Sequence, residues 1–203
     1  MGNYYDRNVT SAKVSVISNA LISMIKLILG IYLASGWFIT NAVYYIILSI
    51  ARGHALSKYT AAKQIDNPQQ RFNMEFAVYK RSGIFLCLIG ISYLLVCLRM
   101  YLRGDATIYK GYAVFLVAAV AFTKLSFAVH GIIIARHIKD PVIAALKAIS
   151  FVDAMVSIVV TQCTLLTMTA SVNAVVSSAI LGMGFSILFI IIGLCMLVKK
   201  KKQ

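Results

Sequence analysis

Two long apolar runs near the start of the chain, residues 14–33 and 37–56, most constrain how it can fold. Each run is about 20 residues long, which is the length that an α-helix needs to cross the hydrocarbon core of a bilayer. Only three residues, 34–36, separate the two runs, so the two helices must form an antiparallel hairpin. These three residues carry no charge. Basic residues flank the two far ends of this hairpin: Arg7, Lys13, Arg52 and Lys58. The positive-inside rule therefore places these ends in the cytoplasm and the short turn outside.

The composition indicates a polytopic membrane protein. The 203 residues are 61% hydrophobic, and such a sequence leaves too few polar residues to cover a water-facing surface. We therefore expect a single transmembrane domain over residues 1–203 of a multi-pass cell-membrane protein. The net charge of +14 does not indicate nucleic acid as a partner, because most of the basic residues fall in segments expected to face anionic lipid head groups. The expected partner is the lipid bilayer, and the sequence leaves open whether the protein forms a homodimer.

Hydropathy predicts an all-α membrane protein with six transmembrane helices and with both termini in the cytoplasm. The predicted spans are residues 14–33, 37–56, 82–102, 112–135, 142–168 and 172–198. Basic charge is dense in every second connection, and the longest and most charged connection is residues 57–81, broken at Asn67-Pro68. The third connection, with Arg103 and Lys110, departs slightly from this alternation. The lysine run 199–202 has two readings, a patch that binds lipid head groups or an anchor that stops the last helix.

Three charged residues, Lys26, Lys124 and Asp153, each lie about twelve residues inside a predicted span. At 1.5 Å per residue each lies roughly 18 Å from the surface at which its span begins, near the middle of the bilayer. Buried charges in a membrane usually face the interior of the bundle and form pairs. We therefore predict that Asp153 accepts from Lys26, Lys124 or both. This pair could fix the helix packing, or it could form a substrate or proton site.

Three further polar residues complete the candidate site. Asn41 and Tyr44 share one face of the second span, because they are three residues apart on a helix. A buried asparagine needs hydrogen-bond partners, so we expect this face to point inward. His130 lies six residues beyond Lys124 in the fourth span and is a candidate proton relay, although a lone histidine in a membrane more often serves packing.

Two segments resemble the transmembrane domain of the cation diffusion facilitator family. The first comprises Ser18-Asn19-Ala20-Leu21, Lys26-Leu27-Ile28-Leu29-Gly30, Ser35-Gly36 and Thr40-Asn41-Ala42-Val43-Tyr44-Tyr45; the second is residues 140–154. The resemblance implies a six-helix bundle with two metal ligands four residues apart on the second helix and two on the fifth. These ligand positions fall on Tyr44, Leu48, Ile149 and Asp153.

The metal site implied by the resemblance is largely lost. Asp153 is the one zinc ligand that remains, and zinc in proteins usually takes four donors from cysteine, histidine or carboxylate. We expect no counterpart of the family's cytoplasmic metal-sensing domain, since the six predicted spans take up residues 14–198 of the 203. We expect neither a metal nor another cofactor. A carboxylate beside two lysines gives a positively charged site, which suits an anion, a proton relay or no ligand.

The sequence contains no motif for phosphate-loop, metalloprotease or triad chemistry, so we do not expect an enzyme. Two hypotheses follow. The chain could be a transporter of a non-zinc ion or small solute, which predicts a polar cavity around Asn41, Tyr44 and Asp153. Alternatively, it could be a non-transporting structural or partner subunit on the same fold, which predicts a dry and packed centre. Gly182 and Gly184 in the last span are expected to permit close helix packing.

Overall fold

A computed structural model describes residue 28 and residues 36–62, 64–104, 113–138, 140–169 and 171–200. These residues form five α-helices and no strand: α2 (Gly36–Ala62), α3 (Pro68–Arg103), α4 (Ala113–Ile138), α5 (Pro141–Met168) and α6 (Ala174–Val198). The helices α4, α5 and α6 agree with the predicted spans to within three residues at each end. The first predicted span, residues 14–33, lies outside the described residues apart from Ile28.

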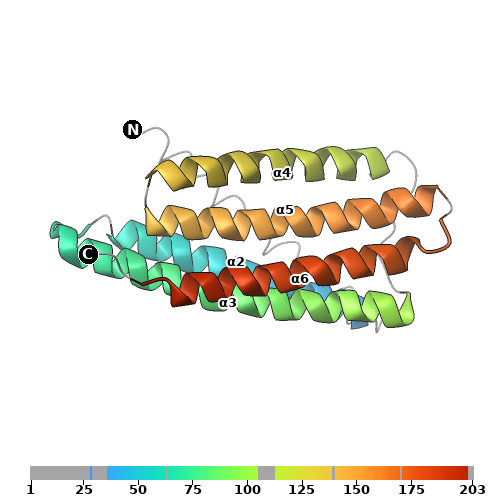
Figure 1. Cartoon of the computed structure of the whole chain (residues 1–203), viewed down its shortest axis with the longest axis horizontal. Coiled ribbons are helices and arrows are strands. Elements are labelled where there is room, and N and C mark those ends of the chain that lie inside the picture. Colours follow the sequence, from blue (N-terminus) through green and yellow to red (C-terminus); the bar gives the residue numbers. More distant parts are fainter. Residues whose placement is uncertain are drawn as a thin grey trace.

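The five helices run side by side as an elongated bundle (Figure 1). The most extensive helix pair is α3 with α6, and α4 packs against α5. The two pairs contact each other directly, α5 against α6 and α3, and α2 packs against both α3 and α5. The C-terminal ends of α2, α4 and α6 and the N-terminal ends of α3 and α5 all lie at the left end of the bundle in Figure 1. This end, called the basic end below, collects every connection predicted to be cytoplasmic that the structure describes.

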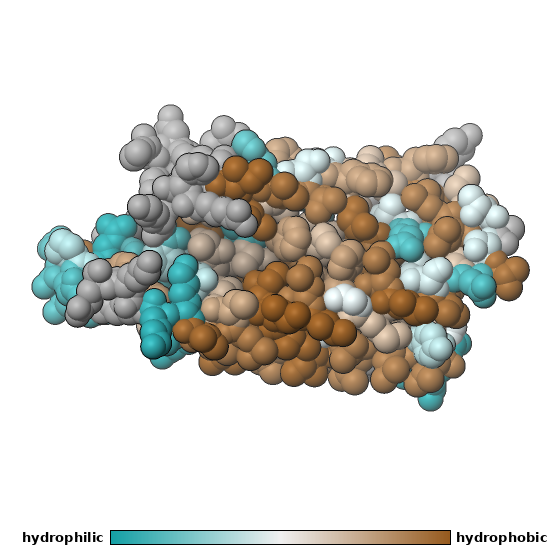
Figure 2. Space-filling view, in the orientation of Figure 1, coloured by the Kyte–Doolittle hydropathy of each residue, from teal (hydrophilic) through white to brown (hydrophobic). Residues whose placement is uncertain are grey.

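Four of the described helices are long and apolar enough to cross a membrane, namely α3, most of α4, α5 and α6. Helix α2 is not among them, since Asn41, Arg52 and His54 interrupt its apolar stretch. Exposed apolar side chains cover the middle of the face shown in Figure 2, and hydrophilic side chains gather toward the ends. On α3 the exposed residues follow a spacing of four and three: Ile84, Leu88, Ile91, Leu95, Leu98 and Leu102. Such a continuous apolar stripe is typical of a surface that faces lipid.

The charged connection at residues 57–81 is mostly helical, which its composition did not predict. Helix α2 continues to Ala62, and α3 already begins at Pro68. The predicted break at Asn67-Pro68 is confirmed, because the Asn67 side chain caps α3 by accepting from the backbone N–H groups of Gln69 and Gln70. With 36 residues α3 is about 54 Å long, which exceeds the roughly 30 Å hydrocarbon core. Its length therefore exceeds what a membrane span needs, and its charged first turns lie at the basic end.

Glycines allow α3 and α6 to approach each other closely. A Cβ atom on Gly193 of α6 would lie 2.7 Å from the carbonyl oxygen of Gly83 on α3, and one on Gly90 would lie 3.0 Å from the carbonyl oxygen of Ser186. The predicted role of Gly182 in close packing is confirmed, because its Cβ would collide with the sulfur of Cys97. At Gly184, in contrast, no atom of the described residues lies within 4 Å of an added Cβ, so this glycine serves no close contact among the described helices. Small residues at helix contacts let backbones approach and gain van der Waals contact, which is a main attraction between helices in lipid.

Candidate functional site

Three charged side chains meet near the middle of the bundle, and we call Arg52, Lys124 and Asp153 the midplane charge cluster. The carboxylate oxygen Oδ2 of Asp153 on α5 accepts from Nη2 of Arg52 on α2 at 3.2 Å. The same oxygen accepts from Nζ of Lys124 on α4 at 3.4 Å. The predicted pairing of Asp153 with Lys124 is confirmed. The other predicted partner, Lys26, lies outside the described residues.

The three residues lie at similar depths along their helices. Measured from the basic end, Arg52 is ten residues from Ala62, Asp153 is twelve from Pro141, and Lys124 is fourteen from Ile138. These separations correspond to about 15, 18 and 21 Å at 1.5 Å per residue. The long side chains of arginine and lysine bridge the remaining differences. The cluster therefore joins three helices at one level, about 15–21 Å from the basic end.

Burial differs among the members of the cluster. The side chains of Arg52 and Asp153 are 4% and 7% exposed, whereas that of Lys124 is 43% exposed. Arg52 and Asp153 are therefore a buried ion pair, for which desolvation is costly and removal of one partner is costlier still. Lys124 reaches the pair from the edge of the bundle. The cluster holds two cations and one carboxylate, so its formal charge is positive.

Sequence reasoning treated Arg52 as a basic residue flanking the second span and missed its pairing with Asp153. Arg52 is buried in the described bundle and is the closer of the two cations to Asp153. One signal could have identified it, because Tyr44, Leu48 and Arg52 follow each other at intervals of four residues. They therefore share one face of α2, which the structure turns toward α5.

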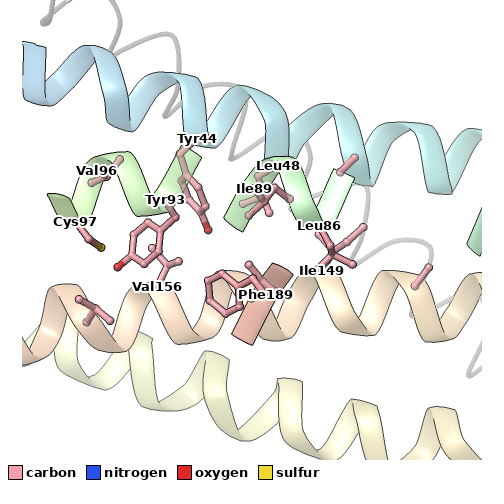
Figure 3. Close-up of a cluster of buried hydrophobic side chains, with 14 of the residues drawn as sticks. Tyr44, Leu48, Leu86, Ile89, Tyr93, Val96, Cys97, Ile149, Val156 and Phe189 are labelled. Carbon is pink, nitrogen blue, oxygen red and sulfur yellow. The ribbon is translucent and has the colours of Figure 1, made fainter. Parts of the chain in front are cut away.

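Two buried oxygen atoms beside this face have no hydrogen-bond partner in the part of the chain that the structure describes. They are Oδ1 of Asp153 and the hydroxyl of Tyr44. The Tyr44 ring packs against Tyr45 and Tyr93, with centroids 5.1 and 5.5 Å away (Figure 3). Buried polar atoms in proteins almost always have a partner, so each orphan calls for an explanation such as a ligand or a water molecule.

The remaining predicted site residues are placed as follows. Asn41 belongs to α2, one turn before Tyr44, but its side chain lies outside the described part of the structure. His130 is exposed on α4, about 9 Å along the helix from Lys124. At a spacing of six residues it points in a different direction from Lys124, and the structure does not bring it to the cluster. Its role as a proton relay stays a prediction, as does the assignment of all these residues to a transport site.

The positions that correspond to the family's metal ligands do come together. Tyr44, Leu48 and Ile149 are each 0% exposed and belong to one hydrophobic cluster, and Asp153 follows Ile149 by one turn of α5 (Figure 3). Three of the four positions thus supply apolar packing or a phenol. The described residues contain no group of three or more histidine, cysteine or acidic side chains that could hold a metal ion. The cation that pairs with Asp153 at these positions is the guanidinium of Arg52.

We therefore expect the purified protein to bind zinc negligibly. Isothermal titration with ZnCl2 should give no saturable heat in the micromolar range, and EDTA should leave the melting temperature unchanged. The physical reason is that Arg52 and Lys124 repel a dication and that Leu48 and Ile149 offer no donor. A stoichiometric zinc site that disappears in Asp153→Asn would contradict this prediction.

Comparison with known proteins adds no identification, because neither a protein-family model nor a curated protein matches this chain. The resemblance to cation diffusion facilitators therefore stands on the residues quoted above. The described residues define an all-α protein with four helices that are long and apolar enough to span a membrane.

Proposed function

We propose that the protein is a multi-pass cell-membrane protein that transports a small anion, with the midplane charge cluster as its binding site. The basic end faces the cytoplasm in this proposal, in agreement with the positive-inside rule. The observation that carries the proposal is the excess of positive charge around Asp153: two cations from two other helices share one carboxylate oxygen. Ionisable groups at this depth are costly and usually serve ion or substrate pathways.

The net charge of the midplane charge cluster indicates which class of substrate it would bind. One carboxylate neutralises one of the two cations, so the cluster has a net positive charge that attracts an anion and disfavours a divalent metal. Arginine suits this role, because its planar guanidinium can donate to carboxylate or other oxyanions with two N–H groups. Lys124 is the member through which an anion would first meet the cluster, since its side chain is 43% exposed. In the conformation described, Asp153 holds the place of the anion.

The test uses the purified protein in liposomes on a solid-supported membrane, with concentration jumps of chloride, nitrate, acetate and phosphate. We expect at least one of these anions to give a saturable current. Lys124→Gln should reduce that current at least tenfold with little loss of stability, because the residue lies at the edge of the bundle. The control is Lys58→Gln, which changes the charge equally at the basic end of α2 and should leave the current unchanged. If the wild type gives no current with any of the four anions, and none of them raises its melting temperature, the proposal fails.

A second candidate function is favoured by the dryness of the centre. Tyr44, Leu48 and Ile149 are fully buried, and the buried pair between Arg52 and Asp153 joins α2 to α5. This arrangement supports a non-transporting membrane subunit in which the pair fixes helix register. Such a subunit would give no current with any solute, yet it would lose stability when the pair is broken. A denaturant titration of Asp153→Asn addresses this alternative.

A further inference from the structure

A cavity of about 1080 Å³ opens at the basic end of the bundle, away from the midplane charge cluster. Its walls come from the first turns of α3 and α5 and from the last turns of α4 and α6. The cavity reaches from Asp140 and Lys200 at the helix ends to Phe151, ten residues into α5, which is about 15 Å. In a bilayer this depth corresponds to the head-group layer and the first part of the acyl chains.

The lining of the cavity changes from basic to apolar with depth. Lys199 and Lys200 lie where α6 ends, and Lys147 adds a third ammonium group from α5. Lys147 lies across Gly131 of α4, where a Cβ atom would be 2.8 Å from its Cδ and 3.2 Å from its Nζ. The absence of a side chain at Gly131 thus gives Lys147 its place in the wall. Asp140 is the one acidic residue among the described lining residues, and its carboxylate is engaged in capping α5.

One wall of the cavity is an aromatic ladder on the part of α3 that extends beyond the predicted span. Phe72 stacks on Phe76, and Phe76 stacks on Tyr79, with centroid distances of 6.2 Å in both cases. The ammonium group of Lys199 lies 5.2 Å from the centre of the Tyr79 ring, so α6 is tied to the ladder by a cation–π contact. Aromatic and basic side chains together are typical of the interface between membrane and water.

We propose that this cavity binds one anionic phospholipid, with its phosphate among Lys147, Lys199 and Lys200 and an acyl chain against the apolar walls. Charge complementarity selects the head group, because three lysines face a single engaged carboxylate in the described lining. The apolar inner wall, with Phe151, Ile192 and Met196, selects a molecule that also carries a hydrocarbon chain. The volume is large enough for a head group and part of a chain.

The proposal is tested by native mass spectrometry of the detergent-purified protein titrated with phosphatidylglycerol or phosphatidylcholine. We expect one molecule of phosphatidylglycerol to bind saturably, with at least tenfold preference over phosphatidylcholine. Lys199→Gln/Lys200→Gln should weaken this binding more than tenfold, since each basic residue near a membrane surface contributes roughly fivefold. Adding Lys147→Gln should abolish the preference.

The matched control is Lys58→Gln/Arg81→Gln, which removes the same charge from α2 and α3 without replacing a residue of the cavity lining. Binding should stay within twofold of the wild type in this variant, and the melting temperature of every variant confirms that it is folded. Equal losses in the control would show a diffuse attraction to the surface and overturn the site. Equal binding of both lipids would overturn the head-group assignment. Displacement of the lipid by millimolar inorganic phosphate would assign the cavity to a soluble phosphate instead.

Discussion

Asp153→Asn is expected to lower the free energy of unfolding by about 3–5 kcal/mol, the usual cost of removing one partner from a buried ion pair. The loss is large because the Arg52 guanidinium, with its side chain 4% exposed, would keep its charge but lose its ion pair with Asp153. Lys124 can turn outward, since its side chain is 43% exposed, so the cost falls on Arg52. The measurement is a denaturant titration of the purified protein in micelles, followed by circular dichroism.

A matched control is available at the start of the same helix. Asp140 caps α5 by accepting from the backbone N–H groups of Val142 and Ile143, and an asparagine oxygen can do the same. Asp140→Asn should therefore cost less than about 1 kcal/mol, although the chemical change is identical. A loss of similar size in both variants would show that Asp153 carries no special structural role.

The double variant Arg52→Met/Asp153→Leu separates the two candidate functions. Replacing both charges by apolar side chains of similar volume should recover most of the stability lost in Asp153→Asn, because no buried charge is left alone. A transporter would regain its fold in this variant but lose its anion current. If the wild type also carries no current, recovery of stability alone favours the structural subunit.

Gly193→Ala is expected to destabilise the protein by about 1–3 kcal/mol, the range typical of an overpacked core. The added methyl group would lie 2.7 Å from the carbonyl oxygen of Gly83 and 3.0 Å from the backbone nitrogen of Cys87. Both atoms belong to the α3 backbone, so no rotation of a side chain can relieve the contact and the two helices must separate. The same denaturant titration measures this effect.

Gly184→Ala is the matched control for this prediction. Gly184 lies on the same helix, and no atom of the described residues is within 4 Å of an added Cβ. Its replacement should change stability by no more than about 0.5 kcal/mol. If Gly193→Ala is as harmless as Gly184→Ala, the close approach of α3 and α6 is not present in the membrane-embedded protein.

The apolar parts of the helices could be predicted from hydropathy, and the charged extension of α3 could not. Residues 112–135, 142–168 and 172–198 are apolar throughout most of their length, so hydropathy alone locates α4, α5 and α6. Residues 68–81 carry Arg71, Glu75 and Lys80 and read as a connection, yet they continue α3. A helix that enters water keeps its backbone hydrogen bonds while its side chains become polar, so a hydropathy limit does not mark its end.

The candidate site could be predicted in part for a similar reason. Lys124 and Asp153 stand out because each lies deep within an apolar run, and the structure pairs them. Arg52 was missed because an arginine near the end of an apolar run resembles an interfacial anchor. What decides its role is the rotation of α2, which places it on the face of Tyr44 and Leu48, and that rotation is fixed by packing against α3 and α5.

The unbroken course of α3 has a mechanical consequence. A helix of 36 residues without an internal proline behaves as a stiff rod, so a change of inclination at one tip is amplified at the other. A tilt of about 10° around Arg103 would move the Asn67 tip by roughly 9 Å over a length of about 54 Å. The Phe72–Tyr79 segment would move together with the Asn67 tip. A small tilt at the Arg103 end would therefore produce a large displacement at the basic end.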